Sequence, residues 1–109
     1  MSTSARKYHD KEVRVTKNKA KPKYILRLFV SGILQNSVRA ITNLKMICEQ
    51  HLKGDYELEI IDIYQQPALA ITEQIIVIPV MIVKFPLPER RIIGDLSNTA
   101  AVLEILNLN

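Results

Sequence analysis

Apolar and polar residues follow two different periods in the first half of the chain, and each period predicts one kind of element. Residues 24–30 alternate in steps of two, which predicts a largely buried strand that Ser31-Gly32 ends. From about residue 36 to 53, apolar residues recur at steps of three and four, which predicts an amphipathic helix. Residues 56–63 return to a period of two and predict another strand. Strand, helix and strand in this order favour a right-handed βαβ unit with parallel strands.

The second half of the chain predicts a short helix, a hairpin and a final helix. The short helix begins at Pro67, a residue suited to a first helical position. Residues 75–85 are rich in Ile, Val and Met, which favour a strand, and residues 89–93 follow two prolines and can form its hairpin partner. A last helix carries its apolar residues inward through about Leu106. The complete order is βαβαββα in a single α/β domain, which is the order of the thioredoxin-like fold.

Capping residues mark where the two longer helices begin and end. Asn36 or Ser37 can cap the first helix through a side-chain oxygen, and Gly54 can end it. In the second half, Gly94-Asp95 supplies a turn, after which Ser97 can cap the final helix.

Pro79 interrupts the apolar run of residues 75–83 and has no backbone N–H to donate to a ladder. One interpretation is a trans proline in an edge strand, which the rarity of cis bonds favours. The other is a cis proline in a loop beside a binding surface. The thioredoxin order of elements leads us to expect the cis form.

Charge is distributed unevenly along the 109 residues, of which 48% are hydrophobic. Residues 1–23 contain eight Lys or Arg and two acidic residues, a net charge of +6, whereas the remaining residues have a net charge of −2. Because the first segment has little to bury, we expect a disordered basic arm at residues 1–23 and a folded domain at residues 24–109. The arm could contact phosphates, but a solvated tail without a specific partner is the interpretation we favour.

The residues that could support catalysis are few. Cys48 is the only cysteine, so the chain has no internal disulfide and no redox pair. The loop that would hold the thiols of a thioredoxin, residues 33–36, contains none, which excludes that activity. Cys48 is expected to be a buried hydrophobic residue. Asp62, at the end of a strand, has no nucleophile to activate and is interpreted as facing solvent or a neighbouring chain.

Signals for a metal, a cofactor or a membrane are also lacking. The two histidines have no second ligand at suitable spacing, and no segment has the roughly 20 apolar residues that a membrane helix requires. We therefore expect a cytoplasmic protein that is not an enzyme and uses no cofactor.

Several runs of residues together resemble the KaiB family, the small partners of the KaiC clock ATPase. The resemblance spans about residues 24 to 98. It rests on the segments YILRLFVSG at residues 24–32, NSVRA at 36–40 and RRIIGDLSN at 90–98, with Pro67 and Pro79 between them. The last two segments are the most specific to the family.

The resemblance implies a non-enzymatic regulator that binds the ATPase ring of a KaiC-type protein and forms a homo-oligomer, dimeric or tetrameric. Family members exchange between a thioredoxin-like fold and a resting fold whose C-terminal half is βααβ. In this chain the segment 77–83 is rich in β-branched residues, which lower helix stability by some tenths of a kcal/mol each. We therefore expect a bias towards the thioredoxin-like fold.

Departures from the family pattern favour a non-clock paralogue, acting in stress or signalling control of a KaiC-like ATPase. Glu59 and Gln74 stand where clock-type members typically carry lysines, and a basic arm is added. Because like charges brought together can cost several kcal/mol, binding of KaiA or of a sensor kinase is disfavoured.

The resemblance also assigns candidate site residues. Five are expected to contact the partner: Asn36, Arg39, Glu59, Arg90 and Arg91. Three are expected to belong to the conformational switch: Pro79, Gly94 and Asp95. The alternative function is an interaction module whose basic arm binds nucleic acid or acidic proteins, although nucleic acid is the less favoured partner because Tyr8 is the arm's only aromatic residue.

Overall fold

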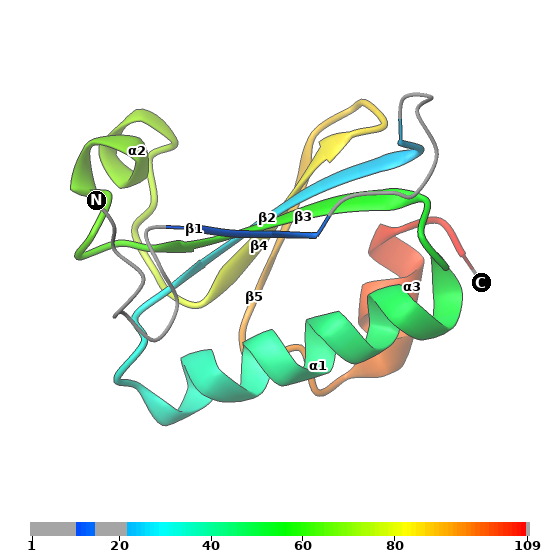
Figure 1. Cartoon of the computed structure of the whole chain (residues 1–109), viewed down its shortest axis with the longest axis horizontal. Coiled ribbons are helices and arrows are strands. Elements are labelled where there is room, and N and C mark those ends of the chain that lie inside the picture. The colour runs from blue at the N-terminus through cyan, green and yellow to red at the C-terminus, as the bar shows by residue number, and fades with distance from the viewer. Residues whose placement is uncertain (1–10, 15–21, 109) are drawn as a thin grey trace.

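The computed structural model describes residues 11–14 and 22–108 and shows a twisted sheet with helices on both faces (Figure 1). The strands lie in the order β1-β3-β2-β4-β5. From β2 onward the order along the chain is βαβαββα, which confirms the predicted thioredoxin-like α/β fold. The elements are β1 (Lys11–Arg14), β2 (Tyr24–Val30), α1 (Gln35–His51), β3 (Tyr56–Asp62), α2 (Pro67–Thr72), β4 (Val80–Phe85), β5 (Arg90–Ile93) and α3 (Thr99–Ile105).

Strand pairing follows the predicted βαβ unit and hairpin. β2 and β3 are parallel, with Tyr24 opposite Tyr56 and Val30 opposite Asp62. β4 runs antiparallel to β2 on the other side, and β5 pairs antiparallel with β4. The central strands β2, β3 and β4 are largely buried, which explains their nearly continuous apolar sequences.

Two apolar clusters lie on opposite faces of the sheet. The larger lies between the sheet and helices α1 and α3, which cover the same face in Figure 1. The smaller lies on the other face, where α2 contributes Leu69, and contains Phe29, Ile61, Val80 and Ile82. Cys48 is fully buried in the larger cluster, as expected.

The prediction that Asn36 or Ser37 caps α1 is wrong. Leu34 occupies the N-cap position and makes no side-chain cap. Ser37 is the third residue of the helix, where its buried hydroxyl accepts a hydrogen bond from the backbone N–H of Ser31 at 3.1 Å. That hydroxyl fastens the end of β2 to α1 instead. α1 ends at His51, two residues before the predicted end, and both Lys53 and Gly54 then have a left-handed φ, +39° and +79°. Gly54 therefore belongs to the turn after the helix, which Lys53 already begins.

The predicted cap of α3 is displaced by one residue. Asn98, rather than Ser97, is the N-cap, and its Oδ1 accepts a hydrogen bond from the N–H of Ala101 at 3.1 Å. The N–H of Ser97 donates to the Asp95 carboxylate at 3.0 Å, which forms a turn just before the helix.

Residues 75–85 form a strand only from Val80 onward, so the predicted strand was five residues too long. Pro79 cannot donate to the ladder, and its carbonyl accepts a hydrogen bond from the N–H of Gly94 at 2.9 Å. The proline therefore ends the pairing of β4 with β5, and residues 75–79 are a loop.

The Ile78–Pro79 peptide bond is cis and precedes the strand, which confirms the expected cis form in a loop. The bonds that precede Pro86 and Pro88 are cis as well.

Strand β1 lies inside the segment for which the sequence predicts a disordered arm. Its four residues pair antiparallel with β3, from Lys11 opposite Ile61 to Arg14 opposite Leu58. Without β1, β3 would be an edge strand with unpaired backbone N–H and C=O groups. Another segment can form hydrogen bonds with these groups whatever side chains it carries, so composition does not predict the pairing. The structure thus differs from the expectation at these four residues. The rest of the predicted arm up to residue 21 lies outside the described residues.

Candidate functional site

Four loops of the described chain meet at one edge of the sheet, which we call the loop edge: residues 31–34, 63–66, 75–79 and 94–98. β2 and β3 are parallel, so both end here. Val80, at the start of β4, lies opposite both Phe29 near the end of β2 and Ile93 at the end of β5. The loop before β4 and the turn after β5 therefore reach the same edge. It lies at the left in Figure 1, beside the N-terminal end of α1.

Asp62 holds two of these loops together. Its Oδ2 accepts a hydrogen bond from the N–H of Gly32 at 3.3 Å, and its Oδ1 accepts one from Tyr64 at 2.9 Å. The Asp62 side chain is therefore used inside the protein, and the residue is only 9% exposed. The interpretation that it faces solvent or a neighbouring chain was wrong, because the end of β2 lies beside it.

Large apolar side chains project from the loop edge into solvent. Ile33 is 86% exposed, Tyr64 73% and Ile76 91%. Exposed apolar groups gathered at one end of a domain are typical of a surface that binds another protein. We call the exposed apolar residues of these loops and of the first turn of α1 the loop-edge surface: Ile33, Leu34, Val38, Tyr64, Ile76 and Val77.

An ion pair joins α1 to the turn that follows β5. Arg39 Nε lies 3.2 Å from Asp95 Oδ2, and Asn43 donates from Nδ2 to the Asp95 carbonyl at 2.8 Å. Hydrogen bonds from the Ser97 hydroxyl and backbone N–H, together with Arg39, lower the pKa of Asp95 below its ordinary value. The carboxylate is therefore charged throughout the neutral range.

The structure brings the three predicted switch residues, Pro79, Gly94 and Asp95, to the loop edge. The N–H of Gly94 donates to the Pro79 carbonyl, whereas the Asp95 carboxylate pairs with Arg39 of α1. Asn36 lies nearby in the first turn of α1. The remaining partner-binding candidates lie on strands, Glu59 in the middle of β3 and Arg90 and Arg91 at the start of β5. Of these, Arg91 lines a groove together with Ile76 and Val77 of the loop-edge surface.

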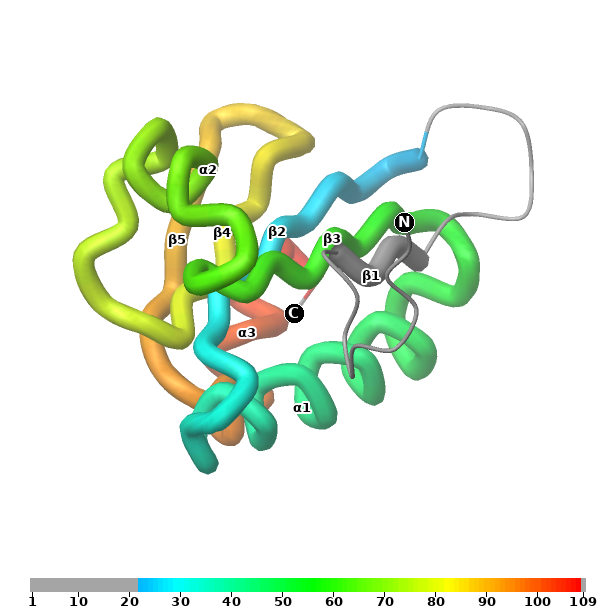
Figure 2. Tube along the Cα trace, turned by 60° about the vertical axis from the view of Figure 1, so that its left-hand side comes forward, coloured from blue at the N-terminus to red at the C-terminus, as the bar shows by residue number. Residues whose placement is uncertain are grey.

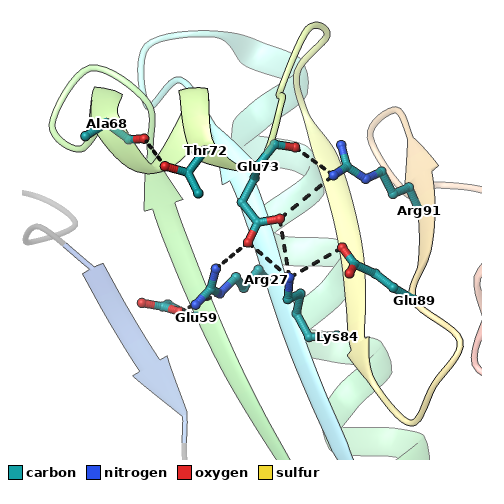
Figure 3. Close-up of polar contacts among 8 residues, drawn as sticks. All are labelled: Arg27, Glu59, Ala68, Thr72, Glu73, Lys84, Glu89 and Arg91. Atoms are coloured by element: carbon teal, nitrogen blue, oxygen red, sulfur yellow. Dashed lines mark hydrogen bonds and ion pairs between the residues drawn. The ribbon is translucent and has the colours of Figure 1, made fainter.

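Glu59 and Arg91 belong to an ion-pair network that sequence reasoning did not find (Figure 3). At its centre is the Glu73 carboxylate, 12% exposed, with Arg27 Nη1 at 2.8 Å and Lys84 Nζ at 3.0 Å. Arg91 Nη2 donates to the Glu73 carbonyl at 2.6 Å and lies 3.8 Å from its carboxylate. We call the whole set the Glu73 network: Arg27, Glu59, Glu73, Lys84, Glu89 and Arg91.

The Glu73 network lies on the face of the sheet that carries α2 and joins the end of α2 to three strands. Glu59 lies 3.1 Å from Arg27 Nε and its side chain is 15% exposed, so it serves this internal network. One signal in the sequence was available, namely the charged Arg27 and Lys84 inside otherwise apolar strands. Their acidic partner comes from a distant helix end, which a pattern along the chain does not reveal.

Arg90 differs from its neighbour Arg91. Its Nε and Nη2 atoms are buried and have no hydrogen-bond partner. Arg90 lies on the same face of β5 as Ile92, which packs against the cluster under α3, whereas Arg91 lies on the α2 face. The two adjacent arginines therefore have opposite surroundings.

The segment that joins β2 to α1 contains no thiol, since Ile33 and Leu34 of the loop are followed by Gln35 and Asn36 at the start of the helix. Among the described residues, no three His, Cys, Asp or Glu side chains are placed to hold a metal ion. No helix within residues 11–14 and 22–108 combines the length and apolar character needed to cross a membrane.

Comparisons with known proteins identify the family of this chain. The KaiB domain family matches residues 27–108. The circadian clock oscillator protein KaiB of Nostoc sp. is 45% identical over 91 residues, which cover 84% of this chain and 84% of that protein. The protein of the same name from Synechococcus elongatus is 47% identical over 85 residues, 78% of this chain and 83% of that protein.

Solved structures show the same fold at lower identity. Chloroplastic thioredoxin z superposes with a TM-score of 0.68 at 19% identity, covering 80% of this chain and 78% of that one. The N-terminal domain of Synechococcus elongatus SasA gives a TM-score of 0.65 at 17% identity, covering 87% and 90%. These two likenesses concern the fold alone. The identity to the clock proteins and the match over residues 27–108 show that the chain belongs to the KaiB family.

Proposed function

We propose that this chain is a non-enzymatic regulatory protein that binds the ring of a KaiC-type ATPase through the loop-edge surface. The observation that supports this most strongly is the combination of KaiB-family membership with exposed Ile33, Tyr64 and Ile76 at one edge of the sheet. Apolar side chains of this size add binding energy when a partner removes them from water. Arg39, paired at the surface with Asp95, can also contact acidic groups of the partner.

The binding-competent conformation in this proposal is the thioredoxin-like one. Two features favour it over a resting fold with a helical C-terminal half. The β-branched residues of β4 suit a strand. The ion pairs of Glu73 with Lys84 and Arg91 bring the end of α2 to the β4–β5 hairpin, and they would be lost if that hairpin rearranged. A partner that prefers this fold would shift the population further towards it.

We also propose that the protein acts outside the clock, in stress or signalling control. The support is Glu59, at a position where clock-type relatives typically carry a lysine that contacts a partner. In this chain the acidic Glu59 side chain pairs with Arg27 instead. KaiA-type and sensor-kinase partners are therefore disfavoured. Separately, we expect the free protein to be a homo-oligomer, as family membership implies. The alternative, in which the basic arm binds nucleic acid or acidic proteins, gains no support from β1, since that strand pairs with β3.

Isothermal titration calorimetry of the full chain against a KaiC-type ATPase of the same organism tests the proposal, with the ring loaded in turn with ATP and with ADP. Binding in at least one nucleotide state is expected. Deletion of residues 1–10, which leaves β1 in place, should keep the affinity. Absence of binding in both states would refute the proposal, and loss of binding on deletion would favour the arm.

A further inference from the structure

Strand β5 forms one outer edge of the sheet, and its surroundings point to a second interaction surface. The other outer strand is β1, whereas β5 follows β4 and has no strand of residues 11–14 or 22–108 on its far side. In Figure 2 the loop that precedes β4 runs alongside β5, at the left of the molecule. The two segments enclose a groove of about 280 Å³ lined by Gln74, Ile76, Val77, Val80, Arg91 and Ile93.

The register of the hairpin shows which backbone groups of β5 point away from the sheet. The N–H of Gly94 donates to the Pro79 carbonyl, so Gly94 faces β4. In an antiparallel pair the inward-facing residues alternate, so Ile92, opposite Met81, also faces β4. Arg91 and Ile93 therefore direct their N–H and C=O groups outward. These two donors and two acceptors can pair with an added strand.

The two faces of an added strand would meet different environments. On the α2 face it would lie along the groove, where Ile93 is 63% exposed and Ile76 is 91% exposed. On the α3 face it would pass Arg90. Because side chains of a strand alternate between faces, a fitting segment has apolar residues at every second position.

The charge of Arg90 indicates which residues should stand between the apolar positions of the added segment. Arg91 has its counter-charge within the protein, since Glu73 lies beside it. Arg90 has none among the described residues, and its Nε and Nη2 donate no hydrogen bond. A guanidinium stays charged at every physiological pH, and a carboxylate is its best geometric complement. The long Arg90 side chain can turn towards a carboxylate that arrives beside β5.

We propose that β5 is a strand-addition site for an extended segment of a partner protein in which apolar and acidic residues alternate. Main-chain hydrogen bonds to Arg91 and Ile93 supply the attachment, the apolar residues fill the groove, and an acidic residue pairs with Arg90. This site goes beyond the proposed function and does not depend on an ATPase partner, although it shares Ile76 and Val77 with the loop-edge surface.

Titration of the ¹⁵N-labelled full chain with two capped peptides, Ser-Val-Glu-Val-Glu-Val-Ser and Ser-Val-Lys-Val-Lys-Val-Ser, followed by NMR, tests the inference. The acidic peptide should shift the amide signals of residues 91–94 and 74–77, and the lysine peptide should bind roughly tenfold more weakly or less. In Arg90→Glu the preference should reverse. Ile93→Pro removes an outward-facing donor without touching the β4 ladder and should abolish binding.

Equal binding of both peptides by the native chain and by Arg90→Glu would overturn the inference. It would equally be overturned if the β5 amides shifted with protein concentration and not with peptide, since a second copy of the chain would then be the occupant. The amide spectrum of each variant without peptide also shows whether that variant is folded, so loss of binding can be distinguished from loss of structure. A loss of ATPase binding in the calorimetric experiment would leave this result unaffected.

Discussion

Arg27 on β2 and Glu73 just after α2 form an ion pair of 2.8 Å, although 46 residues separate them in the chain. Lys84 of β4 and Arg91 of β5 reach the same glutamate. One partly buried carboxylate therefore holds α2 against three strands of the sheet. Two of these strands, β4 and β5, form the hairpin that would rearrange in the resting fold considered under the proposed function.

Glu73→Gln should lower the free energy of unfolding by about 1–3 kcal/mol, because the cations around Glu73 lose their counter-charge in a partly buried site. Urea denaturation measures this change. Glu89→Gln is the matched control, since Glu89 is more exposed and lies 3.4 Å from Lys84; its effect should stay below about 1 kcal/mol. Equal losses in the two variants would contradict a central role for Glu73.

Substitutions at the loop edge should separate binding from stability. Ile33→Asp and Tyr64→Ala change side chains that are 86% and 73% exposed, so the unfolding free energy should move by no more than about 0.5 kcal/mol. Affinity for the KaiC-type ATPase should fall roughly tenfold or more, as expected when a central apolar contact is lost. Calorimetry measures the affinity.

Met46→Asp is the control for these loop-edge variants. Met46 is likewise an exposed apolar residue, but it lies in the second half of α1, away from the loop edge. Its affinity should match that of the native chain. A loss as large as that of Ile33→Asp would show that the partner binds the outer side of α1 instead.

The pKa of Asp95 should rise when its hydrogen-bond donors are removed. The Ser97 hydroxyl and backbone N–H, and then Arg39, lower this pKa, so both Ser97→Ala and Arg39→Ala should move it back towards the ordinary value. NMR titration of the side-chain carboxyl group gives the pKa directly. An unchanged pKa in both variants would contradict the contacts of Asp95 with Ser97 and Arg39.

The sign of the pH dependence follows from that lowered pKa. The folded state binds the Asp95 proton more weakly than the unfolded state does. The contribution of Asp95 to stability is therefore complete above the unfolded pKa and is lost as the pH falls through the folded pKa. In Ser97→Ala this acid-dependent loss should be smaller than in the native chain.

Cys48 reports on opening of the core. Its side chain is fully buried in the cluster between the sheet and α1, so a thiol reagent should react with it only when the structure opens. The rate of labelling should rise with urea in parallel with unfolding. Complete labelling of the native chain within seconds would show that α1 does not cover this face.

Much of the fold follows from periodicity. β2 has the predicted bounds, Tyr24–Val30, and α1 lies within two residues of the predicted range, because long periodic segments bury one face each. Loop residues were harder to place. Pro79 shortens β4, and Ser37 bonds the backbone of Ser31, an interaction that depends on the end of β2 lying close by.

The candidate site could be predicted only in part. Pro79, Gly94 and Asp95 were found from a family resemblance. They lie close together because Pro79 directly precedes β4, whereas Gly94 and Asp95 directly follow β5, its antiparallel partner. Glu73 was missed because its three cationic partners come from three different strands. The outward-facing Ile33 and Tyr64 lie in loops, where periodicity has no meaning.

The most direct test of the central claim is an NMR comparison of the labelled chain, free and bound to the KaiC-type ATPase. Residues 80–85 and 90–93 should have strand chemical shifts in both states, and the largest changes on binding should fall on Ile33, Leu34, Tyr64 and the loop 75–79. Helical shifts at residues 80–85 in the complex, or changes confined to surfaces away from the loop edge, would contradict the account.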